Sequence, residues 1–239
     1  MTRATYQLLD GFRRLFEGRP YLHRNASQGD RVARLLYEDL YSVSRSKLLC
    51  ARIERRERVL NVANRVQGIR ARRGDAAFGE LVPNSNAVEV EGAAIARGPI
   101  ATLEIGAEVK ILAKAMVKQL DRVESDLKRQ VEQFRQRGEN PICIGIVGIN
   151  HAESCVGYEG AREYRTDGKK NPHPIQEAAE AEARLLERAA PAFDEFLVLR
   201  YSAPNEPPFP FRWVQLDRTA TDYGAILARV ARKYDARFR

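Results

Sequence analysis

The feature that most constrains the fold is the run ATLEIGAEVKIL at 101–112, which predicts a long β-strand. Side chains alternate between the two faces of a strand. One face would carry only apolar side chains, those of Leu103, Ile105, Ala107, Val109 and Ile111. The other face would carry Glu104, Gly106, Glu108 and Lys110. The apolar face can cover a core, whereas charged side chains have poor strand propensity, so we expect the charged face to serve a function.

A second alternating run, residues 86–92, precedes this strand, and Gly98-Pro99 predicts a turn between the two. We expect a hairpin centred on that turn, in which Glu89 faces Glu108 and shares its side of the sheet. The hairpin would gather carboxylates and an ammonium on one surface, those of Glu89, Glu91, Glu104, Glu108 and Lys110. Like charges this close destabilise each other, and a divalent cation would remove that cost.

With these residues the chain resembles the PD-(D/E)XK nuclease superfamily, which includes many restriction endonucleases. Glu108-Val109-Lys110 matches the acid-x-Lys half of the family motif residue by residue. The resemblance implies that Glu108 binds Mg²⁺ (or Mn²⁺) and that Lys110 activates water or stabilises the pentacovalent phosphate. Pro83 is followed by Asn84, so the Pro-Asp half of the motif is missing. The candidates for the first acid are the nearby glutamates Glu80, Glu89 and Glu91.

The elements expected after this strand agree with an α/β core. They are an amphipathic helix over 114–137, a buried strand over 142–149, a helix over 174–190, a strand over 196–201 and an edge strand over 211–214. A helix between parallel strands is the usual crossover. We therefore predict an α/β fold with a restriction-endonuclease-like mixed central sheet flanked by helices. Residues 76–239 would form this core together with a C-terminal helix.

Residues 1–75 are expected to form a basic helical region packed on the core, with helices over 5–17, 30–44 and 48–69. This region holds 17 Lys+Arg and 8 Asp+Glu, so it carries all the excess positive charge of a chain whose net charge is +8. Clustered arginines are typical of phosphate-binding surfaces. The residues expected to bind nucleic acid are Arg52, Arg55, Arg56, Arg70, Arg72, Arg73 and Lys114. The alternative is a solvated helix with internal ion pairs such as Glu54–Arg58.

Together these features predict a Mg²⁺-dependent endonuclease of restriction or defence type that hydrolyses nucleic-acid phosphodiesters, with double-stranded DNA as the expected substrate. Glu108 and Lys110 would be catalytic, and the metal ligands would come from Glu108, Glu91, Glu89 and Glu104. A homodimer would follow if both strands are cut. One alternative is a non-catalytic nucleic-acid-binding or assembly subunit with the same fold. The other is an exposed sheet face on which Lys110 merely pairs with Glu108.

Other features of the sequence add limits and secondary candidates. No apolar run approaches the ~20 residues that span a bilayer, and the N-terminus lacks an apolar signal core, so we expect a cytoplasmic protein without a membrane partner. His151 and Cys155 follow the buried strand, but no Cys-x-x-Cys accompanies them as a zinc site would require. The loop over 158–170 mixes aromatic and basic residues, which is typical either of base stacking or of a mobile surface loop.

Overall fold

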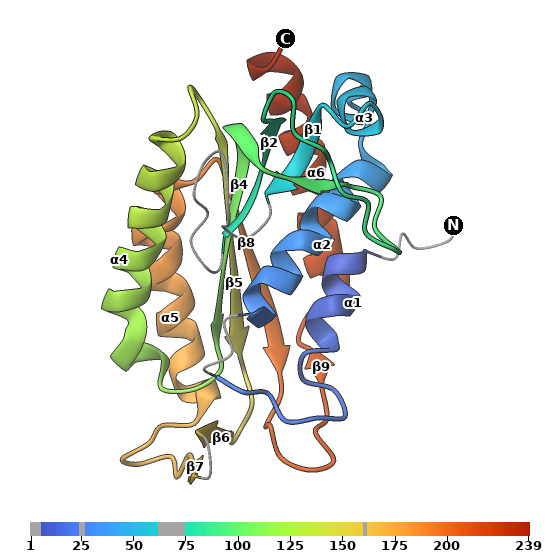
Figure 1. Ribbon diagram of the computed structural model, residues 1–239. Helices are drawn as coiled ribbons and strands as arrows, with labels where there is room; N and C mark the ends of the chain where they lie inside the picture. Colours follow the sequence, from blue (N-terminus) through green and yellow to red (C-terminus); the bar gives the residue numbers. More distant parts are fainter. Residues whose placement is uncertain (1–5, 24–26, 62–74, 160–161) are drawn as a thin grey trace.

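The computed structural model describes residues 6–23, 27–61, 75–159 and 162–239 (Figure 1). In chain order the elements are α1 (Gln7–Arg13), α2 (Ser27–Val43), α3 (Lys47–Glu54), β1 (Arg58–Asn61), β2 (Asp75–Leu81), β3 (Arg97–Gly98), β4 (Ile100–Leu112), α4 (Met116–Arg135), β5 (Ile142–Asn150), β6 (Val156–Glu159), β7 (Arg162–Arg165), α5 (Pro174–Arg188), the short 3₁₀ helix η1 (Ala190–Ala192), β8 (Glu195–Ser202), β9 (Arg212–Trp213) and α6 (Leu216–Arg237).

The described strands form a mixed sheet in the order β3-β1-β2-β4-β5-β8-β9 and a separate two-stranded ribbon, β6-β7. In the sheet, β4, β5 and β8 run parallel, with α4 and α5 as the crossovers between them. Strand β2 pairs antiparallel with both β1 and β4, and β9 pairs antiparallel with β8. The α/β class with a mixed central sheet flanked by helices is therefore confirmed.

Helices cover both faces of this sheet, as Figure 1 shows. Helices α4 and α5 pack on one face, where Leu120 and Leu127 join Val147 of β5 in a buried cluster. Helices α1, α2 and α6 pack on the other face, and their apolar side chains form the largest core cluster with β4, β5 and β8. Alternation along each strand sends side chains into both layers, so a centrally placed strand such as β5 is buried on both faces.

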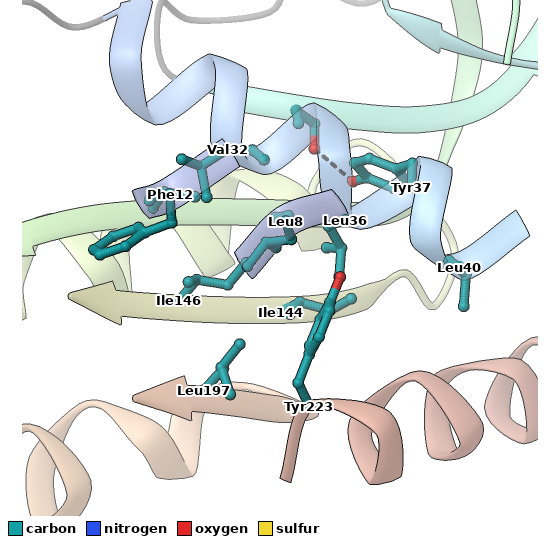
Figure 2. Close-up of a cluster of buried hydrophobic side chains, with 14 of the residues drawn as sticks. Leu8, Phe12, Val32, Leu36, Tyr37, Leu40, Ile144, Ile146, Leu197 and Tyr223 are labelled. Atoms are coloured by element: carbon teal, nitrogen blue, oxygen red, sulfur yellow. Dashed lines mark hydrogen bonds between the residues drawn. The ribbon is translucent and has the colours of Figure 1, made fainter. Parts of the chain in front are cut away.

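The core under α1 and α2 is shown in Figure 2, where side chains from five elements of the chain meet over strands β5 and β8. Ile144 and Ile146 point from β5 toward Leu8 of α1 and Leu36 of α2, and all four are almost fully buried. The Tyr37 hydroxyl lies 2.7 Å from the carbonyl oxygen of Ala76. Burial of these side chains therefore fixes α2 against the β2–β4 pair, which carries the charged residues of interest.

The first two helices of the N-terminal region are confirmed, but the third prediction, a helix over 48–69, was wrong from residue 55 to residue 61, and its remainder lies outside the described residues. Arg56 has a positive φ of 57°, which a continuing helix does not tolerate, and strand β1 follows. Val59 and Leu60 are buried on opposite faces of the sheet. The predicted helical region therefore contributes a strand to the same sheet as the core.

The hairpin expected between 86–92 and 101–112 was also wrong. Strand β4 is present, but its antiparallel partner is β2, and within 86–92 only Val88 forms a bridge, to Arg97. The reason is apolar burial: Ala77 and Phe78 of β2 are buried, whereas Val88 is 58% exposed. A segment whose apolar residues are one alanine and two valines buries too little surface to compete for the edge of β4. None of the described helices is both long and apolar enough to cross a membrane.

Candidate active site on strand β4

Glu108 and Lys110 lie two residues apart on β4 and form an ion pair, with Lys110 Nζ 2.7 Å from Glu108 Oε1. The Glu108 side chain is only 7% exposed, whereas that of Lys110 is 28% exposed. A carboxylate this deeply buried is costly unless a positive charge and hydrogen bonds compensate it. The ammonium provides this compensation and is also the part of the pair that solvent reaches.

The pair lies on the face of the sheet that α4 and α5 cover. Ile105 and Val109 belong to the core on the α2 side, so the residues that alternate with them point the other way. Gly106 confirms this direction, because a Cβ atom there would lie 2.6 Å from the Phe134 ring of α4. Glu108 and Lys110 thus follow Gly106 along the same face, beside the helix that leaves the end of β4.

A residue that the sequence analysis had not considered occupies the position opposite Glu108. In the β2–β4 ladder the partner of Glu108 is Asp75, the first residue of β2. Directly opposed residues of an antiparallel pair share one face of the sheet. The register is held by the adjacent buried residues, Ala76 opposite Ala107 and Ala77 opposite Gly106. Asp75 was expected to be the last residue of the N-terminal helical region, so it was not considered as a site residue.

The other neighbour of Glu108 has no side chain. In the parallel β4–β5 ladder Glu108 pairs with Gly145, and Lys110 pairs with Val147. A Cβ atom at position 145 would lie 2.5 Å from the ring of Phe196, so aromatic side chains take up the space beside this glycine. The carboxylate of Glu108 therefore has an apolar wall on the β5 side.

Glu104 does not belong with Glu108, and the prediction that the two share a face was wrong. The β2–β4 register shifts where Phe78 pairs with Ile105 and Gly79 with Leu103, which leaves Glu104 as the extra residue of a β-bulge. The bulge reverses the alternation, so Glu104 points toward α6. There it accepts hydrogen bonds from Arg58 and from Tyr234, each at 2.7 Å.

The glutamates expected to supply the first acid also lie elsewhere. Glu89 is 72% exposed and pairs with Arg56, and Glu91 is exposed in a turn. Glu80 is on β2 but sits opposite Thr102, six residues along the strand from Glu108. Within the ranges that the structure describes, no three His, Cys, Asp or Glu side chains are grouped closely enough to hold a metal ion. The predicted set of Glu89, Glu91 and Glu104 around Glu108 is therefore not assembled.

The arginines expected to bind nucleic acid are spread over the surface near α3 and are partly occupied by protein contacts. Arg52 lies over the Tyr234 ring, with its guanidinium carbon 5.9 Å from the ring centroid. Arg55 pairs with Glu57, and Arg56 pairs with Glu89. These two pairs are exposed, and such pairs contribute little to stability, so both guanidinium groups can exchange partners readily. Arg70, Arg72 and Arg73 lie outside the described residues.

The His151 and Cys155 pair has features of a buried structural site. Cys155 is fully buried, and burial raises the pKa of its thiol to about 12, which keeps it protonated and a poor nucleophile or ligand. Burial lowers the pKa of His151, and its ring is also influenced by Glu182, which raises the pKa, and by Arg200. Neither side chain belongs to a metal-binding group in the part of the chain that the structure covers.

In the comparisons with known proteins, no family model, no curated protein and no solved structure matches the chain. The candidate site must therefore be judged by its own chemistry. It combines a buried carboxylate, an ammonium two residues further along the same strand, and an aspartate position directly across the antiparallel ladder. Carboxylates on adjacent strands are the ligands that a hard divalent cation takes, and a nearby ammonium can neutralise an anionic substrate.

Proposed function

We propose that the chain is a divalent-metal-dependent endonuclease with a PD-(D/E)XK type of site, in which Asp75 is the first acid, Glu108 the second and Lys110 the lysine. The observation that carries this proposal is the register in which Asp75 faces Glu108. It supplies an aspartate on the strand next to Glu108-Val109-Lys110, where the sequence analysis had only misplaced glutamates. The antiparallel run β1-β2-β4, followed by α4 and the parallel strand β5, further supports this assignment.

The donor set fits Mg²⁺ or Mn²⁺ better than a softer metal. Opposed positions of an antiparallel pair bring Cβ atoms to about 4.5–5.5 Å, so residues at such positions are near enough to contribute to one site. Mg²⁺ binds through one or two carboxylates and completes its shell with water and phosphate oxygens. When bound, the metal would act as a Lewis acid and would generate the attacking hydroxide. Asp75 and Glu108 are the residues that would hold it.

Lys110 would act on the substrate rather than on the metal. Its ammonium now neutralises Glu108, and it is the more exposed member of the pair. Lys110 would orient the attacking water and offset the negative charge that develops on the phosphate oxygens.

The test is metal-dependent cleavage of labelled duplex DNA, single-stranded DNA and RNA by the full chain. We expect cleavage with Mg²⁺ or Mn²⁺ and none with EDTA. Asp75→Asn, Glu108→Gln and Lys110→Met should each lower the rate at least about 100-fold, as expected for groups that act on the transition state. Glu89→Gln and Glu91→Gln are the matched controls, because these carboxylates are remote from β4, and they should leave the rate unchanged.

A second measurement separates metal binding from catalysis. Calorimetric titration with Mn²⁺ should show one site that Glu108→Gln and Asp75→Asn weaken and that Lys110→Met leaves intact. Equal cleavage by the wild type and the three site variants would refute the assignment. DNA binding without cleavage under any metal condition would instead favour the non-catalytic subunit. The homodimer stays a prediction, which light scattering of the DNA-bound and free protein checks.

A further inference from the structure

A basic pocket lies beyond the end of β4, between the first turn of α4 and the β6–β7 ribbon. Its volume is about 320 Å³, at the small end of the range for ligand sites. The lining residues are Lys114, Ala115, Lys118, Tyr164, Arg165, Thr166, Asn171 and Pro172. These described residues include basic side chains and an exposed aromatic ring, and none of them is acidic. This composition suits an anion that also carries a flat group.

The lysines of the pocket are available for an anion. Lys114 and Lys118 make no ion pair among the described residues, and Lys118 Nζ has only a long contact of 3.4 Å to the carbonyl oxygen of Lys170. Arg165 differs, because it pairs with the exposed Glu206. Asp167 is close in sequence but accepts hydrogen bonds from the backbone N–H groups of its own loop, which lower the pKa of its carboxyl. Among the residues that the structure describes, the positive charge of Lys114 and Lys118 is therefore not neutralised by an ion pair.

The position of the Lys114 ammonium is set by the ribbon. Gly157 of β6 pairs with Tyr164 of β7, and a Cβ atom on Gly157 would overlap the end of the Lys114 side chain. The ammonium lies 5.0 Å from the centroid of the Tyr164 ring, a cation–π geometry. Tyr164 nevertheless remains 45% exposed, so part of its ring is open to a stacking partner. One cation and one aromatic surface are thus held side by side.

The root of the ribbon is fixed to the core, so this arrangement is preorganised. Asn205 Nδ2 donates to the carbonyl oxygen of Val156 at 2.7 Å. Cys155 donates its backbone N–H to Thr166 Oγ1 at 2.9 Å, and Thr166 Oγ1 also bonds the His173 ring. A pocket whose walls are held in this way loses little conformational freedom when a ligand binds.

We propose that this pocket binds one unpaired nucleotide of a nucleic-acid strand, with the base stacked on Tyr164 and the adjacent phosphates on Lys114 and Lys118. Aromatic stacking combined with basic side chains is the usual means of holding single strands without sequence preference. A base within a duplex is already stacked and paired, so the pocket selects unpaired strands. In this it deepens the endonuclease proposed above, on which its link to cleavage rests.

The pocket and the candidate active site are close enough to share one strand. Lys114 is four positions after Lys110, which places their Cα atoms at most about 14 Å apart. Both sites border α4, on the same face of the sheet. A strand that enters the pocket can therefore present a phosphodiester a few nucleotides away to Glu108 and Lys110. The expected substrate is a strand that is unpaired next to the cut, such as a flap, a gap or a junction.

The test is fluorescence anisotropy with labelled oligo(dT) and the full chain, carried out in EDTA so that no cleavage occurs. The double variant Lys114→Gln/Lys118→Gln should bind about 10- to 100-fold more weakly. Its slope of log affinity against log salt should fall by about 1.4, because each phosphate contact to a single strand contributes about 0.7. The matched control is Lys128→Gln/Arg129→Gln, which removes the same number of positive charges from α4 away from the pocket. This control should reduce the affinity and the salt slope less than the pocket variant does.

Tyr164→Ala separates stacking from charge. We expect affinity to fall about 5- to 100-fold with no change in the salt slope, because a base–ring contact involves no counterion release. Blunt duplex of the same length should bind less well than oligo(dT), and a free mononucleotide should compete poorly. Tight competition by the mononucleotide, or a preference for duplex, would overturn the strand-binding proposal.

Equal affinity and equal salt slope for the pocket and control double variants would also overturn it, whatever Glu108→Gln does to cleavage. Conversely, the pocket variants could lose binding while Glu108→Gln cleaves as fast as the wild type. That result would refute the assignment of the active site and would still support strand binding by the pocket. Far-ultraviolet circular dichroism and thermal melting of every variant establish that each is folded.

Discussion

The hydroxyl of Tyr234 donates a hydrogen bond to the Glu104 carboxylate across 2.7 Å, and this contact joins the last helix, α6, to the bulge in β4. The second oxygen of Glu104 accepts from Arg58 of β1, also at 2.7 Å. Glu104 is almost fully buried, so it is the centre of a polar cluster inside the α6 side of the core. Burial, together with the nearby carboxylate, raises the pKa of Tyr234, which therefore stays a hydrogen-bond donor.

Glu104→Gln should lower the free energy of unfolding by about 3 kcal/mol, because it removes the close partner of a buried ion pair and leaves the Arg58 guanidinium only its 3.9 Å contact with Glu80. Tyr234→Phe should cost about 1 kcal/mol, the net value of one hydrogen bond. Urea unfolding followed by circular dichroism measures both. Glu89→Gln, at an exposed ion pair, is the control and should cost less than about 1 kcal/mol. A Glu104→Gln value no larger than the control would contradict the structural role given to Glu104.

Three elements, β4, α4 and β5, could be predicted from the pattern of their own residues. Alternation along 101–112 gave β4, three- and four-residue spacing gave α4, and continuous apolarity gave β5, because each pattern is set by the faces that its own residues bury. The partner of β4 is a non-local choice. It was decided by the buried Ala77 and Phe78 of β2, which the sequence analysis had not recognised as part of a strand.

The candidate site was predicted in part for the same reason. Glu108 and Lys110 lie two residues apart on one strand, so local alternation was enough to place them together. Glu104 was misplaced because one extra residue in a bulge reverses the alternation, and no local pattern marks a bulge at that position. Asp75 was missed because its position opposite Glu108 depends on the register between β2 and β4, and the two residues are 33 positions apart in the chain. Registers of this kind follow from packing over the whole sheet.

Gly79 is required by the close approach of β2 and β4 at this bulge. A Cβ atom there would overlap the backbone carbonyl oxygen of Thr102, which cannot move without breaking the ladder. Gly79→Ala should therefore lower the free energy of unfolding by several kcal/mol, on the order of 3. The control is Gly29→Ala in α2, where the nearest heavy atom would be 3.6 Å from the new Cβ. This variant should be neutral or more stable by up to about 1 kcal/mol, since alanine favours helix. Similar thermal midpoints for the two variants would argue against the described register.

Asp194 should make stability depend on pH in the acidic range. Burial alone would raise the pKa of this carboxyl, but hydrogen bonds from Arg237 and from the Cys143 backbone N–H outweigh it, so the folded-state pKa lies below the ordinary value. In the window between the two values the unfolded chain binds more protons than the folded protein. The contribution of Asp194 to the free energy of unfolding is therefore fully present above about pH 3.9, and it is lost as the pH falls through the folded-state pKa.

Urea unfolding at a series of pH values from neutral into this acidic window tests the linkage. The wild type should lose stability as the pH falls through the window, and Asp194→Asn should lose less over the same interval, because the substituted amide does not titrate. At neutral pH the variant should be less stable than the wild type, since Arg237 loses its ionic partner. Asp126→Asn, at an exposed pair on α4, is the control and should follow the wild-type pH dependence. Parallel curves for the wild type and Asp194→Asn would assign the acid sensitivity to other groups.

Two glutamines on α4 offer a paired test of what a buried amide contributes. Gln130 is buried, and its Nε2 has no hydrogen-bond partner among the described residues. Gln119 Nε2, by contrast, donates to the carbonyl oxygens of Lys114 and Ala115 at 3.0 and 3.2 Å. An amide buried without a partner costs about 1–3 kcal/mol, whereas a satisfied hydrogen bond stabilises by about 1 kcal/mol. Replacing the glutamine with leucine should therefore change the free energy of unfolding in opposite directions at the two positions.

Leucine matches glutamine in helix propensity and nearly in size, so Gln130→Leu should raise the free energy of unfolding by about 1 kcal/mol. Gln119→Leu should lower it by a similar amount and should loosen the first turn of α4. Urea titration of both variants gives the two values, and hydrogen exchange at the backbone N–H groups of that first turn reports the loosening directly. If Gln130→Leu were destabilising while Gln119→Leu behaved as expected, the Gln130 amide would have to make a compensating interaction in solution. In that event binding of metal and of oligo(dT) by Gln130→Leu would be measured next, because this helix borders both proposed sites.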